Sequence, residues 1–357
     1  MNKKAIIAMS GGVDSAVAAL LTKENGYECM GVTMRLFHNE DIGVVRENSC
    51  CSLADVEDAR SVAFSLNIPY RVFNFTDRFK DDVILPFIHA YENGTTPNPC
   101  IDCNRFLKFQ KLFQRAKELQ YDYVVTGHYA KIEYYAKTGR YLLKKAADSS
   151  KDQSYVLYSM TQEQLAHTLF PLGALHKTQV RAIAEQHDFK NAKKHESQDI
   201  CFVQNGNYTD FIEHYTGKTY PPGNFINKNG DVLGTHKGII RYTVGQRKGL
   251  GIASNEPLYV AAVNPVENTV TLAPERELYT KTLTAGNINL IAVEELKRPV
   301  RLMAKIRYRH QEEPATVTQN NDNTLTVVFD EPQRAITKGQ SVVLYDGDIV
   351  FGGGIII

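Results

Sequence analysis

Near the N-terminus, six residues combine glycines, hydroxyls and a carboxylate in the order Ser10-Gly11-Gly12-Val13-Asp14-Ser15. A buried-strand pattern at residues 5–9 precedes them, and apolar residues at helical spacing follow. In such a turn, backbone N–H groups and the helix dipole converge on an anion. The pattern predicts a phosphate-binding turn, although it is neither the Gly-Lys-Ser/Thr loop of NTPases nor a dinucleotide fingerprint. A plain turn with Asp14 as a helix cap is the alternative.

The second group of reactive side chains is the cysteines. All six precede residue 202, which is unlike a disulfide scaffold and typical of buried, metal-binding or catalytic thiols in a reducing compartment. Cys100 and Cys103 lie on the proline-rich loop 96–104 at the entrance to a helix, so the helix N-terminus predicts a lowered thiol pKa and a nucleophile. Half of a zinc site is the alternative, but the sequence has no second Cys-x-x-Cys.

The remaining cysteines carry weaker signals. Cys201 lies in a segment, residues 196–203, that looks like a short strand beginning among polar residues, and alone it would be a core thiol. Beside the glycine turn and the 96–104 loop, it becomes a candidate partner in a sulfur relay. Cys29 in an apolar strand is interpreted as a core residue, and the pair Cys50-Cys51 stays ambiguous.

Strands alternate with helices in the first half of the chain. The pattern predicts strands at residues 5–9, 29–34, 70–75 and 123–126, and helices at 54–66, 79–91 and 106–119. This alternation implies a parallel sheet covered on both faces. A hairpin at 131–145 and helices at 161–168 and 177–187 follow.

The composition changes after residue 203, where glycine-rich turns and short strands begin. Three domains are therefore expected, at 1–205, 206–280 and 281–357. The fold class is α/β in the first domain, with a small β-rich domain in the middle and a small C-terminal barrel. The barrel strands are expected at 300–308, 315–318, 324–329, 341–345 and 349–357.

The overall charge is almost balanced, with 41 Lys and Arg against 40 Asp and Glu in 357 residues. That balance argues against a protein that coats nucleic acid indiscriminately. An anionic partner must therefore bind to local patches of basic residues. Residues 131–151 contain six basic residues, and a solvated hairpin face is the equal alternative. A second basic cluster around Tyr308 lies on a predicted strand, whose alternation would place its odd-numbered members on one face: Arg301, Lys305, Arg307 and Arg309.

No apolar run is long enough to span a bilayer, and the N-terminal residues show no signal-peptide pattern. We therefore expect a cytoplasmic protein without a membrane partner.

Taken in order, the motifs resemble the bacterial tRNA-specific 2-thiouridylase family, whose members are PP-loop ATP pyrophosphatases. The resemblance covers nearly the whole chain, in the segments 8–15, 50–60, 96–104, 126–128, 151–153, 196–203, 242–251 and 305–309. It implies a Rossmann-like PP-loop domain of the adenine nucleotide alpha hydrolase type, a small central domain and a C-terminal β-barrel.

The resemblance also implies residue roles. Cys103 would be the nucleophile and Cys201 the carrier of a persulfide, and the two would form a disulfide in turnover. ATP would bind to Ala8, Met9, Ser10, Gly11, Gly12, Val13, Asp14, Ser15, Met34 and Gly127. Asn98, Pro99 and Cys100 would contact the target base. The tRNA would contact His128, Lys151, Asp152, Gln153, Arg307, Tyr308 and Gln340.

In such an enzyme, ATP and Mg²⁺ would activate the C2 oxygen of the wobble uridine by adenylation, and a persulfide sulfur would then replace it. One departure from the family stands out. Some members have an aspartate where this chain has Cys100, and the nearest acidic residue here is Asp102. Three cysteines in this region also keep an iron–sulfur cluster open. No protein-ligated metal site is otherwise expected.

The implied partners are tRNAs, namely those for Lys, Glu and Gln, and a cysteine desulfurase or sulfur-relay protein as the persulfide donor. Two rival functions remain. Another PP-loop adenylating enzyme, such as a lysidine or amide-forming synthetase, would need no thiol pair. A non-catalytic RNA-binding protein would bind tRNA without releasing AMP.

Overall fold

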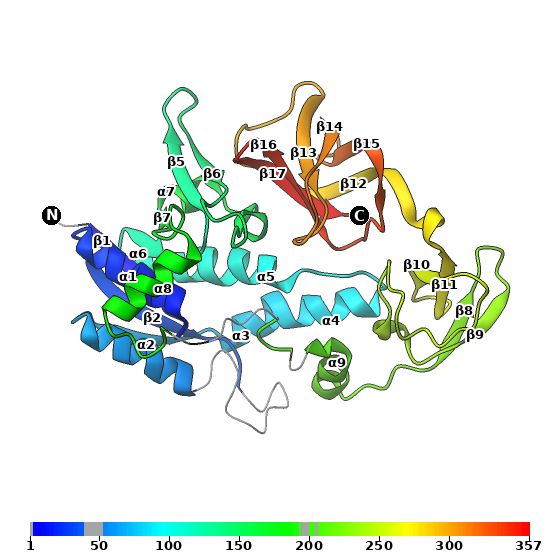
Figure 1. Ribbon diagram of the computed structural model, residues 1–357, viewed down its shortest axis with the longest axis horizontal. Helices are drawn as coiled ribbons and strands as arrows, with labels where there is room; N and C mark the ends of the chain where they lie inside the picture. The colour runs from blue at the N-terminus through cyan, green and yellow to red at the C-terminus, as the bar shows by residue number, and fades with distance from the viewer. Residues whose placement is uncertain (1–2, 39–52, 193, 195–199, 204–205) are drawn as a thin grey trace.

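The computed structural model describes residues 3–38, 53–192, 194, 200–203 and 206–357. Figure 1 shows a helix-covered sheet at one end of the long axis and a smaller sheet at the other, with a barrel beside them. In the described part of the chain, no helix combines the length and the apolar character that crossing a membrane requires.

The N-terminal sheet is parallel, as the sequence predicts, with strand order β3-β2-β1-β4-β7. The chain leaves β1 for β2 on one side, and β4 lies on the other, so a topological switch point falls between β1 and β4. Ligands of open α/β sheets bind at the carboxyl ends of strands at such a point. The strands are β1 (Lys4–Ala8), β2 (Glu28–Arg35), β3 (Tyr70–Asn74), β4 (Tyr123–Val125) and β7 (Thr168–Leu169).

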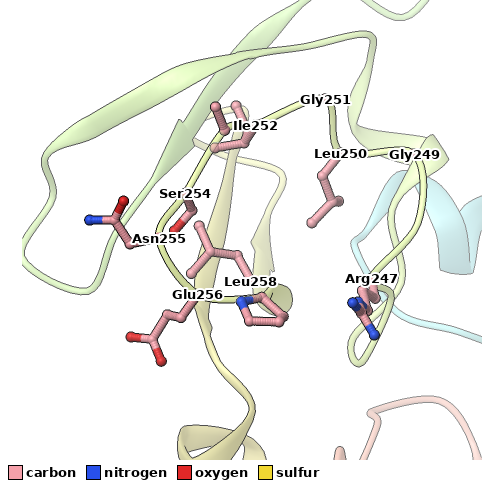
Figure 2. Close-up of a pocket in the computed structure, with 11 residues that line it drawn as sticks. Arg247, Gly249, Leu250, Gly251, Ile252, Ser254, Asn255, Glu256 and Leu258 are labelled. Carbon is pink, nitrogen blue, oxygen red and sulfur yellow. The ribbon is translucent and has the colours of Figure 1, made fainter.

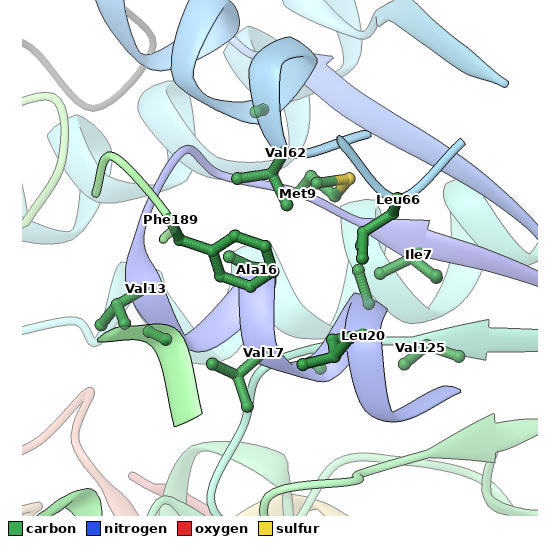
Figure 3. Close-up of a cluster of buried hydrophobic side chains, with 14 of the residues drawn as sticks. Ile7, Met9, Val13, Ala16, Val17, Leu20, Val62, Leu66, Val125 and Phe189 are labelled. Atoms are coloured by element: carbon green, nitrogen blue, oxygen red, sulfur yellow. The ribbon is translucent and has the colours of Figure 1, made fainter. Parts of the chain in front are cut away.

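Both faces of this sheet are buried because successive side chains of β1 point to opposite sides. Ala5 and Ile7 pack with helices α1 (Val13–Glu24), α2 (Leu53–Ser65) and α8 (Lys177–Gln186) (Figure 3). Ile6 packs on the other face with α6 (Leu112–Glu118). All three side chains are fully buried.

Two long helices of the first domain each contain a π-helical stretch. Helix α3 (Thr76–Phe79) continues through Lys80–Ile84 into α4 (Leu85–Glu92). Helix α5 (Pro99–Asp102) continues through the π-helical residues Cys103–Lys111 into α6. The loop predicted at 96–104 is therefore partly wrong, because Pro99 at the first helical position starts the helix early. π-Helical turns occur often at functional sites.

The C-terminal barrel is confirmed, and it is closed because β12 pairs with both β15 and β17. The predicted hairpin, β5 (Lys131–Tyr135) and β6 (Arg140–Lys144), extends the same sheet, with Leu143 opposite Val350. Short helix α7 (Gln162–Ala166) packs near β6. The barrel strands are β12 (Tyr279–Leu290), β13 (Val300–Lys305), β14 (Glu313–Gln319), β15 (Leu325–Arg334), β16 (Ser341–Asp346) and β17 (Ile349–Ile356).

The central region contains α9 (Tyr208–Thr216) and a four-stranded sheet of order β10-β11-β8-β9. Its apolar side packs on α4, with Phe87 against Phe211. The strands are β8 (Gly223–Ile226), β9 (Val232–His236), β10 (Leu258–Asn264) and β11 (Thr269–Pro274).

One predicted strand is too long and another is wrong. Strand β13 ends at Lys305, and a bend and turn follow, so strand alternation does not extend to Arg307 and Arg309. Residues 201–203 form a turn and bend rather than a strand. In both places the local apolar pattern reflects burial of Ile306 and Phe202, not strand pairing.

Candidate active site

The glycine turn follows β1 directly and opens α1, as predicted. Gly11 has a φ of +77° and Gly12 is extended at the start of the helix. The Ser10 backbone N–H donates to Ser15 Oγ at 3.2 Å, and Ser15 Oγ donates to the Gly12 carbonyl at 2.9 Å. The turn is thus held in shape by its own serines, at the sheet edge where a nucleotide would bind.

Two glycines allow close backbone approach at this turn. A Cβ on Gly11 would lie 2.5 Å from the Asp55 carbonyl oxygen, and one on Gly127 would lie 2.8 Å from the Asp14 carbonyl carbon. Gly127 therefore brings the end of β4 against the first turn of α1. This contact explains why glycine is needed at both positions.

Asp14 is held by residues from distant parts of the chain. The Lys177 ammonium donates to both carboxylate oxygens at 2.7 and 2.8 Å, and the Tyr129 hydroxyl donates to Oδ1 at 2.7 Å. Lys177 itself is 8% exposed, so a buried cation lies beside the turn. Sequence reasoning missed this lysine, because its local sequence resembles that of any lysine at the start of a helix.

A second unforeseen contact fixes the turn from the other side. The buried Asn191 amide donates to the Gly11 carbonyl at 2.9 Å. Next to it, the Lys194 ammonium donates to Asp55 at 2.6 Å and to Asp58 at 2.7 Å. Residues after α8 therefore clamp both the turn and the start of α2.

The pKa prediction for the cysteine loop is wrong. Burial raises the pKa of the Cys100 thiol to about 11 and also raises that of Cys103. Lys108 lowers both pKa values, but its effect is smaller than that of desolvation. Cys100 is still reachable by solvent, whereas Cys103 is half-buried. A thiol in this site needs a proton acceptor before it can act as a nucleophile.

Asp102 supplies an ionisable group between these thiols. Burial raises the pKa of its carboxyl to about 6, and Arg105 lowers it by a smaller amount. A carboxyl with a pKa near neutrality is suited to accept or donate a proton at physiological pH.

Cys103 and Cys201 pack against the same apolar cluster, which also contacts Met34 at the end of β2. Met34, on the strand next to β1, and both proposed thiols therefore pack against one apolar cluster. The four described cysteines, Cys29, Cys100, Cys103 and Cys201, are all reduced, and no disulfide joins them. Cys29 is buried in the sheet core, as predicted, while Cys50 and Cys51 lie outside the described residues.

Metal ligands are sparse in this region. No three or more His, Cys, Asp or Glu side chains are placed to hold an ion, as far as the described residues go. Magnesium is usually held by one or two carboxylates together with substrate phosphates; Asp14 is the carboxylate of this turn, and its two oxygens accept from Lys177 in this structure. An iron–sulfur cluster usually needs a set of gathered thiolates, and the described cysteines do not form one.

The predicted tRNA-contact residues lie at the junction with the barrel. The Tyr308 hydroxyl donates to the Asp152 carbonyl at 3.2 Å. Asp152 and Gln153 use their side chains within the protein, accepting from the Ala146 and Tyr129 backbone N–H groups at 2.9 and 3.0 Å. Lys151 is half-buried on the same segment.

His128 and Gln340 are engaged by neighbouring protein groups. His128 is buried against Phe109 and Phe170, and burial lowers its pKa, so the ring is neutral near pH 7. Gln340 Nε2 donates to the Thr96 and Pro97 carbonyls at 2.9 and 3.2 Å.

The target-base segment follows directly after these carbonyls. Asn98 is half-buried, Pro99 is buried and Cys100 is exposed. The barrel therefore holds the loop that carries the predicted base contacts.

Comparison with known proteins covers the entire chain. Three family models match: a tRNA methyl transferase HUP domain at residues 3–205, a tRNA methyl transferase PRC-barrel domain at 209–274 and an aminomethyltransferase beta-barrel domain at 280–356. The tRNA-specific 2-thiouridylase MnmA of Clostridioides difficile is 51% identical over 356 residues, covering 100% of this chain and 98% of that protein. The Acetivibrio thermocellus protein of the same name is 52% identical, covering 99% of each chain.

Among solved structures, a 4-thiouridine synthetase–RNA complex with bound ATP is similar at a TM-score of 0.38 and 17% identity. The match covers 60% of this chain and 50% of the synthetase.

Proposed function

The chain belongs to the tRNA-specific 2-thiouridylase family and is an enzyme of that type, and from this premise we propose how its residues exchange the C2 oxygen of the wobble uridine (U34) for sulfur. The observation that supports the proposal is that Cys103 and Cys201 pack against one apolar cluster, which Met34 also contacts from the strand beside the one that leads into the glycine turn. A rival PP-loop enzyme that uses an amine would need no such thiols.

ATP would bind at the turn through Ala8–Ser15, Met34 and Gly127. The backbone N–H groups of the turn and the start of α1 would hold the phosphates. The buried Lys177 ammonium lies next to Asp14, where it would offset negative charge on the departing pyrophosphate. Magnesium, held by Asp14 and the phosphates, would supply further charge neutralisation there.

Adenylation turns a poor leaving group into a good one. The C2 oxygen of the uridine attacks the α phosphorus of ATP, and pyrophosphate leaves. A Cys201 persulfide then attacks C2 through its terminal sulfur, AMP leaves, and the new sulfur links C2 to Cys201. Finally, the Cys103 thiolate attacks Cys201 Sγ, which releases 2-thiouridine and leaves a Cys103–Cys201 disulfide that an external thiol must reduce.

Asp102 would handle the protons of these steps. In family members with an aspartate at the position of Cys100, a carboxylate is present two residues earlier. The raised pKa of Asp102 keeps it half-ionised near pH 6 and mostly ionised at pH 7.5. It can therefore accept the proton that Cys103 must lose.

The tRNA would meet Asn98, Pro99 and Cys100 with its target base, and the predicted contacts at the barrel junction with its backbone: His128, Lys151, Asp152, Gln153, Arg307, Tyr308 and Gln340. The substrates would be the tRNAs for Lys, Glu and Gln, with a cysteine desulfurase or relay protein as donor, in the cytoplasm. The three parts of the chain would act as the PP-loop domain (1–205), the central domain (206–280) and the barrel (281–357).

Nucleoside mass spectrometry tests the reaction. Unmodified tRNA is incubated with the protein, ATP, magnesium, and cysteine with a cysteine desulfurase. We expect 2-thiouridine at the wobble position, with AMP and pyrophosphate as products. The variants Cys103→Ser and Cys201→Ser should abolish thiolation, and Cys29→Ser, which removes a core thiol, is the matched control that should retain it.

The outcomes separate the rivals. AMP release that survives both cysteine substitutions, without sulfur in the RNA, would favour an amine-using PP-loop enzyme. Binding of tRNA without AMP release would favour a non-catalytic protein. Iron and sulfide analysis of anaerobically purified protein tests the cluster separately, and stoichiometric iron would contradict the thiol-only route.

A further inference from the structure

The segment 242–251 of the central region belongs to the family motifs but has no role in the chemistry above. We infer that its turn, Thr243–Lys248, is a docking site for the phosphate backbone of tRNA outside the anticodon loop. The inference rests on the proposed function for the identity of the RNA. Three observations support the inference: the turn is held rigidly by hydrogen bonds, its two cations are unpaired within the described residues, and contacts connect it to the junction with the barrel.

The turn is held in one conformation by its own side chain and by β10. Gln246 Oε1 accepts from the Thr243 N–H at 3.1 Å, and Gln246 Nε2 donates to the Lys248 carbonyl at 3.1 Å. The Gly245 N–H donates to the Val260 carbonyl at 2.8 Å, and the Val260 N–H donates back to Gln246 at 2.9 Å. Gly245 has a φ of +90°, which favours glycine.

This turn presents two cations to solvent. Arg247 and Lys248 are exposed, and neither side chain has a hydrogen-bond or ion-pair partner among the residues that the structure describes. Arg247 also borders an open hollow whose rim is formed by residues 249–258 (Figure 2). A stiff turn with free cations loses little conformational entropy when it meets an anion.

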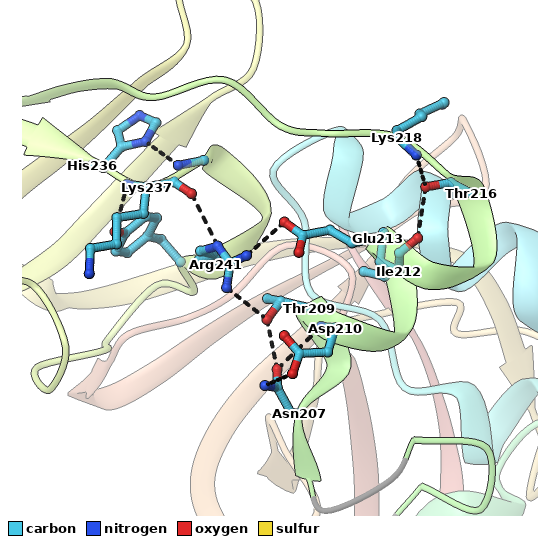
Figure 4. A network of polar contacts seen from close by, with 12 residues as sticks. Asn207, Thr209, Asp210, Ile212, Glu213, Thr216, Lys218, His236, Lys237 and Arg241 are labelled. Atoms are coloured by element: carbon cyan, nitrogen blue, oxygen red, sulfur yellow. Dashed lines mark hydrogen bonds and ion pairs between the residues drawn. The ribbon is translucent and has the colours of Figure 1, made fainter. Parts of the chain in front are cut away.

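Nearby charges are neutralised within the protein. Arg241 donates to Glu213 at 2.7 Å and to Thr209 at 3.2 Å (Figure 4). Glu256, on the rim of the hollow, is paired with Arg276 at 2.7 Å. The positive charge that these ion pairs leave on this surface includes Arg247 and Lys248, together with the exposed Lys237 beside Arg241.

A chain of contacts connects the turn to the predicted tRNA-contact residues. Arg334 Nη2 donates to the Gly245 carbonyl at 3.4 Å, and its guanidinium lies 5.0 Å from the Tyr259 ring centroid. Arg307 Nη2 in turn donates to the Arg334 carbonyl at 2.7 Å. Arg334 is itself paired with Glu275 at 2.8 Å, so it acts here as a connector.

The geometry favours RNA backbone over other anions. Two adjacent exposed cations beside an open hollow would hold a small phosphate only weakly, whereas a polyanion gains from each contact. Tyr259 is covered by Arg334 and buried, so it offers no face for base stacking. In Figure 1 the central sheet lies farther from β1 than α5 does, so an RNA with its target base at α5 would meet the turn through another part of its backbone.

The test measures tRNA binding by filter retention across a series of salt concentrations, for Arg247→Ala/Lys248→Ala and for the wild type. Each exposed contact of this kind contributes up to about fivefold, so we expect about tenfold weaker binding of full-length tRNA. The slope of log affinity against log salt should fall by about 2. Affinity for the isolated anticodon stem-loop should not change.

Two controls sharpen the result. Arg71→Ala/Lys80→Ala removes the same charge from two exposed positions of the first domain that are not predicted tRNA contacts, and it should have little effect. Arg247→Lys/Lys248→Arg keeps the charge and should restore most of the affinity. Equal loss with both RNAs, equal loss in the first-domain control, or no loss in a variant of unchanged melting temperature would each overturn the inference. Wild-type thiolation is measured alongside, so a failure of the proposed function is recognised separately.

Discussion

Asp102 and Cys103 are neighbours whose protons are both held more tightly than in free side chains, because burial disfavours their charged forms. For the carboxyl, a pKa of about 6 means that the base form is lost as pH falls through 6. For the thiols, the nucleophilic form is scarce at neutral pH. Because of these two pKa shifts, we expect the pH dependence of the reaction to come from the proton transfer between Cys103 and Asp102.

We expect Asp102→Asn to lower the rate of 2-thiouridine formation about 10²-fold or more at pH 7.5, since it removes a general base. The wild-type rate should decline below about pH 6, and the variant should lack this decline. Single-turnover assays across pH measure both effects. The double variant Asp102→Asn/Cys100→Asp restores a carboxylate at the family position and should recover activity. An Asp102→Asn rate equal to that of the wild type would exclude the role.

The exposed thiol of Cys100 should react slowly with iodoacetamide. With a pKa of about 11 against the ordinary 9.0, its thiolate fraction at pH 7.5 is about 100-fold below that of an unshifted thiol. Higher nucleophilicity of the thiolate recovers about 8-fold, so alkylation should be about 10-fold slower. Peptide mass spectrometry measures it, with the urea-unfolded chain as reference. Equal rates in folded and unfolded protein would contradict the shifted pKa.

At the scale of elements, the segment before α5 is held by the barrel. The Thr96 N–H donates to the Lys338 carbonyl at 2.9 Å, and a Cβ on Gly339 would lie 3.0 Å from the Thr96 carbonyl oxygen. Gln340 adds two donors to the same segment. Although Gln340 is expected near the tRNA, this geometry gives it a second role in positioning Cys100 and Cys103.

Substituting Gln340→Glu removes both donors and keeps the shape of the side chain. We expect a lower kcat for thiolation, and faster proteolysis of residues 93–98 in the absence of RNA. The melting temperature should fall by a few degrees at most, because two net hydrogen bonds contribute about 1–3 kcal/mol. A rise in KM for tRNA with unchanged proteolysis would instead assign Gln340 to RNA contact alone.

Local patterns predicted the elements well and their long-range contacts poorly. The apolar runs of β1 and β2 identify buried parallel strands, and Thr138-Gly139 identifies the hairpin turn, whereas β3 is an edge strand with mostly exposed side chains. Nothing local indicates that Leu143 would pair with Val350, or that Lys177 would reach Asp14. The thiol pKa values were mispredicted for the same reason. The local sequence indicates that the cysteines lie near the start of a helix, but their burial depends on contacts with distant parts of the chain.

At the scale of the whole molecule, the first domain and the barrel share a sheet and a core. Buried Tyr155 donates to the Ser341 carbonyl at 2.8 Å, and Asn289 donates to the Tyr158 carbonyl at 2.6 Å. Leu143, Val343 and Val350 belong to one apolar cluster. These parts should therefore unfold together.

Calorimetry of Leu344→Ala tests this cooperativity. Leu344 is fully buried inside the barrel, so the substitution should cost about 2–5 kcal/mol. We expect the transition that ATP stabilises to shift down with it, although ATP binds in the first domain. Gly286→Ala, whose Cβ would meet Ile357 at an ordinary 3.7 Å, is the mild control. Separate transitions, with ATP raising one and Leu344→Ala lowering the other, would contradict a shared unit.

The hydrogen bonds between residues 338–340 and the segment Thr96–Pro97 also have a consequence during protein synthesis. Domains generally fold from the N-terminus as the ribosome elongates the chain. Here the loop that carries Cys100 and Cys103 finds its partners only after more than two hundred further residues have been made. A nascent chain or a product of premature termination can therefore form its nucleotide-binding turn while its thiol loop is still unplaced. Such a fragment should not start sulfur chemistry on tRNA before the rest of the protein exists.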